Sequence, residues 1–212
     1  MGGDDAPTMV VRGADLAIER QPDIFFHLVG NEEEIMPLIK ASRHLDSDNH
    51  KIIHTQKKVA PDDKPSVALR GGRDTSMRLA IDLVSDGSAD GVVSAGNTGA
   101  LMAMSKLSLR MCPGIERPAI ASFFPTLKGE SCMLDLGANI ECDANNLVQF
   151  AVMGEIFARI VLGLKNPSVG LLNVGSEEQK GHEELREAAT TLRDLSNVMR
   201  FMGFIEGDDI TA

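Results

Sequence analysis

The amino-acid sequence predicts an α/β fold with a mainly parallel sheet and helices on both of its faces. Short apolar runs of strand length alternate with longer stretches of helical periodicity, which is typical of strand–helix–strand units. Several of the short runs are apolar without strict alternation, as in strands that are buried on both faces. With 212 residues, 43% of them hydrophobic, the chain is long enough to bury a core.

The strand-like and helical runs follow one another along the chain. Strands are expected at 24–30, 51–55, 90–96, 119–124, 131–137, 169–175 and 199–207. Helices are expected at 7–21, 32–45, 76–87, 100–111, 146–164 and 183–195. The runs at 119–124 and 131–137 are close enough in sequence to form a hairpin, so the sheet is expected to be mixed. The polar segment 57–66 holds two prolines and is expected to be a linker or a surface loop.

Composition and charge exclude several classes of function. Aromatic residues make up 4%, with neither Trp nor Tyr, and the formal net charge is −10. The chain therefore has few side chains that could stack on bases and no overall positive charge, and we expect no nucleic-acid partner. Cys112, Cys132 and Cys142 lack CxxC spacing and are expected to be reduced core thiols of a cytoplasmic protein. The sequence shows no apolar run of membrane-spanning length and no signal peptide.

The loop 94–99, between a strand-like run and a helix, is a candidate phosphate cradle. Gly96 and Gly99 let backbone N–H groups approach an anion, and the following helix presents its positive end. For this loop taken alone, the alternative is an ordinary strand-to-helix turn in which Asn97 or Thr98 caps the helix.

Two further loops follow strand-like runs. In LDLGAN, Asn139 can donate to a carbonyl or phosphate oxygen while Asp135 orients a donor, or both can form a local turn. In VGSEEQKG, Lys180 can neutralise phosphate with Glu177 holding it in place, or the run can be a solvated helix cap. Right-handed crossovers bring the carboxyl ends of parallel strands to one edge, where α/β proteins bind ligands. We therefore expect the three loops to converge on a site for an anion and a carbonyl.

Several motifs of catalysis and cofactor binding are missing from the sequence. There is no GxGxxG, GxxxxGK[ST] or GxSxG, so a dinucleotide fingerprint, a P-loop and a nucleophile elbow are unsupported. His50 and His54 lie four residues apart in a strand-like run that lacks the Glu of HExxH. We therefore expect neither a bound metal nor a cofactor.

Eight segments that span the chain match one known family in order. They are MGGDDAP, APDDKPSVALRGGRDTSM, DGVVSAGNTGALMA, GIERPAIA, LDLGAN, QFAVMG, VGLLNVGSEEQKG and FIEGDDI. Together they resemble the phosphate acyltransferase family of bacterial phospholipid synthesis, the PlsX type. The resemblance implies a Rossmann-like three-layer α/β/α fold of the isopropylmalate dehydrogenase-like superfamily, assembled as a homodimer.

The resemblance implies an enzyme that converts acyl–acyl carrier protein and inorganic phosphate to acyl phosphate and free carrier protein. The acyl phosphate would pass to a membrane glycerol-3-phosphate acyltransferase, and the enzyme would associate peripherally with the membrane. Ionised phosphate needs little help from a base and a thiolate leaves readily, so the chemistry requires mainly positioning and oxyanion stabilisation. Loops of backbone amides, Asn and Lys suit that task.

Site roles also follow from the resemblance, residue by residue. Residues expected to bind phosphate or substrate are Gly2, Gly3, Asp4, Ser76, Gly96, Thr98 and Gly99. Residues expected to be catalytic are Asn97, Asp135, Asn139, Glu177 and Lys180. Candidates for docking the acidic carrier protein are Lys57, Lys58, Arg70, Arg73 and Arg78.

The resemblance also bears on the extent of the chain. Family members carry a strand before MGGD and continue past EGDDI, so 1–212 is expected to be a single α/β domain without that strand and the C-terminal third. RGGRDTSM replaces a more usual lysine-rich run that ends in a serine pair. Two alternatives stay open: phosphotransacetylase-like acyl transfer with coenzyme A, and a non-catalytic fragment that binds carrier protein.

Overall fold

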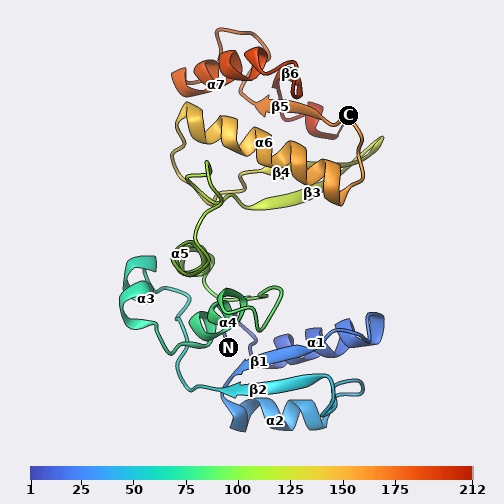
Figure 1. Cartoon of the computed structure of the whole chain (residues 1–212), viewed down its shortest axis with the longest axis vertical. Coiled ribbons are helices and arrows are strands. Elements are labelled where there is room, and N and C mark those ends of the chain that lie inside the picture. The colour runs from blue at the N-terminus through green and yellow to red at the C-terminus, as the bar shows by residue number, and fades with distance from the viewer. Residues whose placement is uncertain (212) are drawn as a thin grey trace. The chain divides into compact units, whose positions relative to one another are not determined.

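The computed structural model describes residues 1–211, and the chain divides into two compact units. Unit 1 is Met1–Arg110 and unit 2 is Met111–Ala212 (Figure 1). Each unit is an α/β assembly with buried apolar clusters of its own. The single α/β domain expected for 1–212 stays a prediction. No helix in the described part of the chain is long and apolar enough to cross a membrane.

Unit 1 begins with a helix followed by a parallel strand pair. The elements are α1 (Thr8–Arg20), β1 (Phe26–Gly30), α2 (Glu32–Lys40) and β2 (His50–His54). Phe26 lies opposite His50 and Gly30 opposite His54 in a parallel register, so α2 is the crossover helix between the strands. Apolar stripes of α1 and α2 pack with β1 in a core of Val11, Ala14, Ile18, Leu28, Ile35, Ile39 and Leu45.

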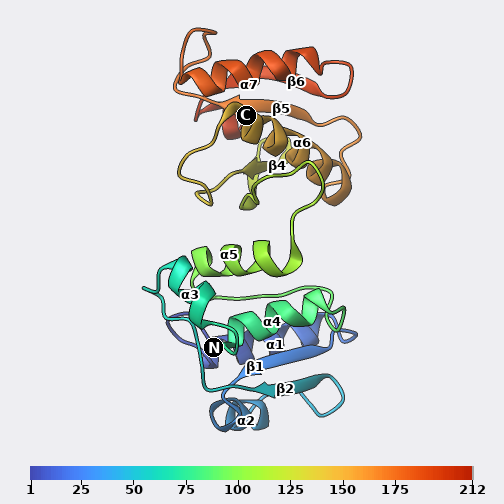
Figure 2. The same cartoon turned by 60° about the vertical axis from the view of Figure 1, so that its left-hand side comes forward.

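Three more helices complete unit 1. They are α3 (Pro65–Gly71), α4 (Ser76–Ser85) and α5 (Thr98–Leu109). Helix α4 packs on β1, and α5 packs on both α3 and α4 (Figure 2). Their core is Val59, Ala68, Met77, Ile81, Ala100 and Met104. This second core positions the segment 94–97, which leads into α5.

Unit 2 contains a hairpin, a long helix and a second parallel strand pair. Its elements are β3 (Ala121–Thr126), β4 (Gly129–Leu134), α6 (Ala144–Val161), β5 (Ser168–Leu172), α7 (Glu183–Asp194), β6 (Arg200–Ile205) and the 3-10 helix η1 (Asp209–Thr211). β3 and β4 are antiparallel, whereas β5 and β6 are parallel with α7 as the crossover. Helix α6 packs on β4, β5 and α7. The core is Ala144, Ala151, Leu171, Ala188, Ala189, Leu192, Met199 and Phe204.

Most elements expected from the sequence are confirmed, including the hairpin and all six helices. The expected strand at 90–96 is wrong, because residues 91–95 have no regular structure and Val93 is 95% exposed. Helix α3 lies partly in a segment expected to be a linker or loop, and its seven residues bury only Ala68. The cysteines are free thiols, but their expected place in a core is wrong, because Cys112 is exposed and Cys132 and Cys142 are only half-buried.

Candidate functional site

The opening turn of the chain packs directly on the loop before α5, backbone against backbone. A Cβ atom on Gly2 would lie 3.0 Å from the Cα of Gly96. A Cβ atom on Gly3 would lie 2.8 Å from the carbonyl oxygen of Ala95, and Gly3 has a φ of +89°. Only glycine fits such an approach and such a backbone conformation. The structure thus brings together two segments that are more than 90 residues apart in sequence, and the exposed Asp4 follows on the same turn.

Ser76 is the first residue of α4 and contacts this turn. Its side chain is buried, and its hydroxyl donates to the carbonyl oxygen of Met1 over 3.1 Å. Thr75 caps α4 by accepting from the N–H of Arg78. The Ser76 hydroxyl therefore fixes the opening turn in this structure, and the residue belongs to the same cluster as Gly2 and Gly96.

Asn97 joins the glycine loop to the segment before α3. Its side-chain oxygen accepts from the N–H of Ala100 over 2.9 Å, which caps α5. Its amide group donates to the carbonyl oxygens of Pro61 and Asp63 over 3.0 and 2.9 Å. Binding of Asn97 to a substrate would require these contacts to be exchanged, so its observed role is to hold the loop.

Thr98 and Gly99 form the first turn of α5. Thr98 is exposed, and a Cβ atom on Gly99 would lie 3.0 Å from Cγ of Pro65. The first N–H groups of a helix have no carbonyl partner within it, and they carry the positive end of the helix dipole. The start of α5 therefore combines a glycine loop with a positive helix end, as an anion site requires.

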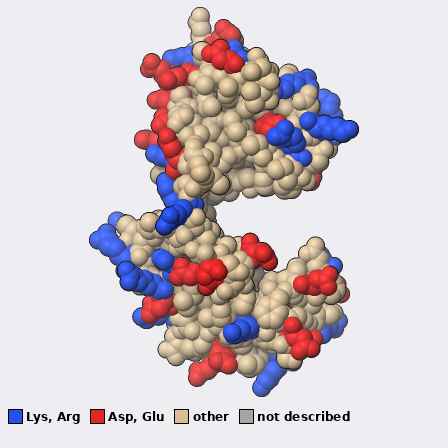
Figure 3. All heavy atoms as spheres, viewed as in Figure 1, with Lys and Arg blue, Asp and Glu red and all other residues tan. Residues whose placement is uncertain are grey.

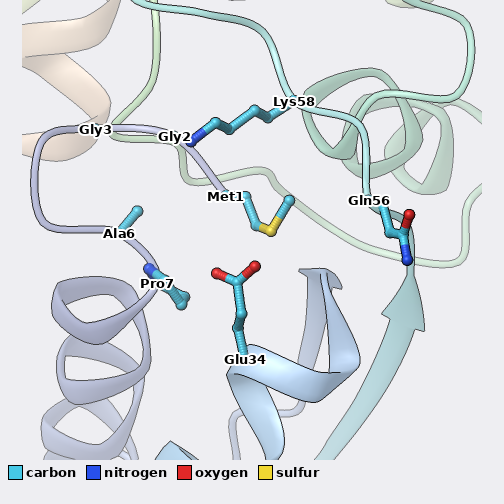
Figure 4. Close-up of a pocket in the computed structure, with 8 residues that line it drawn as sticks. All are labelled: Met1, Gly2, Gly3, Ala6, Pro7, Glu34, Gln56 and Lys58. Atoms are coloured by element: carbon cyan, nitrogen blue, oxygen red, sulfur yellow. The ribbon is translucent and has the colours of Figure 1, made fainter.

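A cavity of about 110 Å³ lies beside the opening turn (Figure 4). It is lined by Met1, Gly2, Gly3, Ala6, Pro7, Glu34, Gln56 and Lys58. The side chain of Lys58 extends toward Gly2, and the carboxylate of Glu34 points into the same space. The cavity is large enough to hold a few water molecules.

Sequence reasoning missed the place of Lys58, which it assigned only to carrier-protein docking. The available signal was that Lys58 comes four residues after the carboxyl end of β2, the edge at which α/β proteins bind ligands. Its neighbour Lys57 is different, because Lys57 forms an ion pair with Asp74 over 2.5 Å.

In unit 2, Asp135 and Asn139 hold one loop together after β4. One carboxylate oxygen of Asp135 accepts from the N–H groups of Ile120 and Ala138, at 2.9 and 3.1 Å. The other accepts from the backbone N–H and the side-chain amide of Asn139, at 2.8 and 2.9 Å. The Asn139 amide also donates to the carbonyl oxygen of Pro118 over 2.9 Å. The structure therefore brings this predicted pair into direct contact.

The pKa of Asp135 reflects this set of donors. Burial alone would raise it, but the hydrogen bonds from Ile120, Asn139 and Ala138 stabilise the ionised form and lower the pKa below its usual value. The loop thus carries a negative charge, and the Asn139 amide donates both to Asp135 within the loop and to the Pro118 carbonyl oxygen before β3.

Lys180 and Glu177 lie on the loop between β5 and α7. Both side chains approach Gly175, because a Cβ atom there would lie 2.6 Å from a carboxylate oxygen of Glu177 and 3.1 Å from Cγ of Lys180. The N–H of Lys180 donates to the carbonyl oxygen of Glu177 over 3.0 Å. Among the described residues, their side chains form no ion pair, whereas Glu178 pairs with Arg193 over 3.1 Å. Lys180 is exposed.

Asn173 shapes this loop and was missed from the sequence. Its amide donates to the carbonyl oxygen of Lys180 over 3.1 Å, and its side-chain oxygen accepts from the N–H of Val174. A Cβ atom on Gly181, whose φ is +84°, would lie 2.4 Å from the Asn173 side-chain oxygen. The position of Asn173 directly after β5 was the signal for a loop-organising residue.

Comparison with known families and proteins gives a match over the whole chain. The model of a family described as "Fatty acid synthesis protein" matches residues 1–212. A protein named phosphate acyltransferase from Rhodospirillum centenum is 63% identical over 212 residues, covering 100% of this chain and 59% of that protein. One of the same name from Rhodospirillum rubrum is 57% identical over 210 residues, covering 99% and 60%. The chain thus spans about three fifths of the length of these relatives.

Two solved structures share the fold. The EutD phosphotransacetylase from Staphylococcus aureus matches with a TM-score of 0.61 at 16% identity, covering 91% of this chain and 63% of that one. A branched-chain phosphotransacylase from Enterococcus faecalis V583 matches with a TM-score of 0.52 at 15% identity, covering 97% and 65%. At these identities the likeness concerns the α/β fold alone.

Proposed function

Since the chain belongs to the fatty acid synthesis protein family, we propose that it acts as a phosphate acyltransferase. The reaction converts acyl–acyl carrier protein and inorganic phosphate to acyl phosphate and free carrier protein. The observation that carries the proposal is the 63% identity, over the whole chain, to a protein named phosphate acyltransferase.

The chemistry asks little of acid–base groups. A phosphate oxygen attacks the thioester carbon, a C–O bond forms, and the C–S bond breaks with the electron pair leaving on sulfur. A thiol with a pKa of about 8.5 leaves without strong acid assistance. What the protein must supply is the positioning of two anionic partners and donors for the oxyanion.

The unit 1 cluster suits phosphate. The start of α5 at Thr98 and Gly99 offers N–H groups that have no partner within the helix. Gly2, Gly3 and Gly96 would shape the site, because their segments pack closely together and the N–H of Gly96 already donates to the Ser94 hydroxyl over 3.1 Å. Ser76 and Asn97 hold these segments in place. Asp4 on the opening turn would accept from donors at the rim of the site.

The unit 2 loops suit the acyl carbonyl and the developing charge. Asn139, fixed by Asp135, would donate to the thioester oxygen after exchanging its bond to the Pro118 carbonyl. Lys180 would offset negative charge in the transition state, with Glu177 orienting it across Gly175.

Finer features of the proposal concern fold and setting. We infer a Rossmann-like three-layer fold of the isopropylmalate dehydrogenase-like superfamily, supported by the parallel pairs β1–β2 and β5–β6 with their crossover helices. The protein would act as a cytoplasmic homodimer with peripheral membrane association. Its acyl phosphate would serve a membrane glycerol-3-phosphate acyltransferase.

The experiment is an assay for phosphate-dependent acyl phosphate formation from acyl–acyl carrier protein. This chain is measured beside the full-length Rhodospirillum centenum relative, with acyl–coenzyme A as the competing thioester. Turnover that depends on phosphate and prefers the carrier-protein thioester supports the proposal. If the relative is active and this chain is inactive, the chain is the non-catalytic alternative. If the chain prefers acyl–coenzyme A as substrate, its activity is phosphotransacetylase-like.

A substitution of Lys180 tests its assigned role in this assay. Lys180→Ala should lower phosphate-dependent turnover at least tenfold, which corresponds to about 1.4 kcal/mol in the barrier. Lys165→Ala removes an exposed lysine elsewhere in unit 2 and should leave turnover unchanged. Unchanged turnover in a folded Lys180→Ala variant would remove Lys180 from the reaction.

A further inference from the structure

Helix α3 and its flanking turns present three exposed cations in a chain whose net charge is −10, with Asp62, Asp63 and Asp74 in the same turns. Lys64, Arg70 and Arg73 are exposed there, and Figure 3 shows blue side chains gathered over this region at the left of the view. Together with Val67 we call these residues the α3 basic surface. A local basic patch on an acidic protein points to an acidic partner, since complementary charge steers association and suppresses wrong partners.

The three cations of this surface form no ion pair within unit 1, although Asp62, Asp63 and Asp74 lie beside them in the sequence and Asp74 is paired with Lys57. Among the described residues, Lys64, Arg70 and Arg73 form no ion pair, and the Nε of Arg70 donates only to the Ser66 carbonyl over 3.3 Å. Two other basic residues of unit 1 do form ion pairs. Lys57 pairs with Asp74, and the Nε of Arg78 pairs with Asp82 over 2.7 Å. Of the residues expected from the sequence to dock the carrier protein, Lys57 and Arg78 are therefore already paired with carboxylates.

An exposed apolar side chain lies within the α3 basic surface. Val67 is 54% exposed, and it follows Lys64 and precedes Arg70 by three residues each. Val67 and Arg70 are three residues apart on α3 and therefore share a face, whereas Lys64 is the residue that precedes the helix. Such a surface offers an acidic helix both charge pairing and an apolar contact.

The α3 basic surface is fixed to the candidate phosphate loop. The side-chain amide of Asn97 binds the carbonyl oxygens of Pro61 and Asp63, directly before α3. Pro65, the first residue of α3, lies against Gly99, so the start of α3 packs on the start of α5. A protein held on α3 would therefore deliver a tethered group beside this loop.

We propose that Lys64, Val67, Arg70 and Arg73 form the docking surface for the acidic carrier protein that presents the acyl thioester. The inference rests on the proposed function and specifies where its protein substrate binds. A lipid surface is less well matched, because one half-exposed valine offers little apolar area for insertion.

The test uses two charge-reversed variants of equal net charge. Lys64→Glu/Arg70→Glu/Arg73→Glu reverses the proposed surface, and Arg12→Glu/Arg20→Glu/Lys51→Glu reverses three exposed residues of α1 and β2 in the same unit. The Kd for acyl-free carrier protein is measured directly. Initial rates are compared with acyl–acyl carrier protein and with acyl-pantetheine, a thioester without the protein. Circular dichroism checks folding, and the single change Arg73→Glu serves as the milder variant.

We expect the surface variant to bind carrier protein at least tenfold more weakly and to show a matching rise in KM. Its rate with acyl-pantetheine should stay within twofold of the parent, and the control variant should match the parent throughout. Equal losses in both variants, or a loss with acyl-pantetheine as large as with the carrier protein, overturn the docking surface. So does selective loss of binding to anionic phospholipid vesicles without loss of carrier binding. Failure of the proposed function looks different: the parent binds carrier protein but forms no acyl phosphate from either thioester.

Discussion

At the scale of single residues, Gly3 is the position where the opening turn tolerates least change. A Cβ atom would meet the Ala95 carbonyl oxygen at 2.8 Å, and the φ of +89° disfavours any L side chain. We expect Gly3→Ala to lower the free energy of unfolding by about 2 kcal/mol, measured by urea denaturation.

Gly13→Ala is the matched control for this change. Gly13 lies within α1, and a Cβ atom there meets nothing within 4 Å. Because alanine favours the helix, this substitution should raise the free energy of unfolding by about 0.5–1 kcal/mol. Similar effects at both positions would mean that the opening turn does not pack as described.

Asp135 makes stability depend on pH. Its pKa is lowered in the folded state, so its stabilising contribution is present above the unfolded pKa of about 3.9 and is lost as pH falls through the folded value. We expect Asp135→Asn to be destabilising at pH 7, and its difference from the parent to shrink as the pH is lowered through 4 toward 3. Urea denaturation across this range measures it. Asp208→Asn, at an exposed position in the same unit, removes a carboxylate to which no described donor bonds and should cost little stability at pH 7.

Asp135 and Gly3 also show which contacts of single residues can be predicted from the sequence. Asp135 and Asn139 lie in one short loop, so the sequence could indicate a local turn or an oriented donor there, and the observed hydrogen bonds join the two residues directly. The contact of Gly3 with Ala95 joins segments about 90 residues apart, and no local pattern encodes that packing. Lys58 at the cavity was not foreseen, although its place soon after the carboxyl end of β2 is a local signal.

At the scale of elements, Asn97 connects α5 to the segment before α3. Asn97→Ala removes the helix cap and also leaves backbone carbonyl oxygens without their donor. We expect it to lower the free energy of unfolding by roughly 2–3 kcal/mol, of which the cap accounts for about 1. Urea denaturation gives the value.

Asn31→Ala is the control, because Asn31 caps α2 by accepting from Glu33 without tying down a second segment. Its expected cost is about 1 kcal/mol. If the two alanine variants were equally stable, the link from α5 to the segment before α3 would contribute nothing.

The elements foreseen from sequence are those with a repeating apolar face. Helices α1, α4 and α7 each bury residues at helical spacing, and the sequence displays that spacing. Helix α3 has one buried residue and so leaves no periodic trace. The run at 90–96 has strand composition, but a strand also needs a partner, and composition does not specify pairing.

At the scale of the whole molecule, the net charge of −10 opposes an acidic partner while the α3 basic surface attracts it. Which effect dominates depends on the Debye length, about 30 Å at 0.01 M salt, 10 Å at 0.1 M and 3 Å at 1 M. At the lowest salt the distant acidic residues act on the partner, and at the highest salt neither field reaches it. Near 0.1 M, only charges close to the contact are felt.

We therefore expect the association rate with acidic carrier protein to pass through a maximum near 0.1 M salt, measured by stopped-flow mixing between 0.01 and 1 M. Reversal of Lys64, Arg70 and Arg73 removes the attraction, so the rate of that variant should only rise with salt. The equally charged control at Arg12, Arg20 and Lys51 keeps the local attraction and should retain the maximum. A steady rise with salt in the parent would show that net charge outweighs the α3 basic surface, which would then not guide docking.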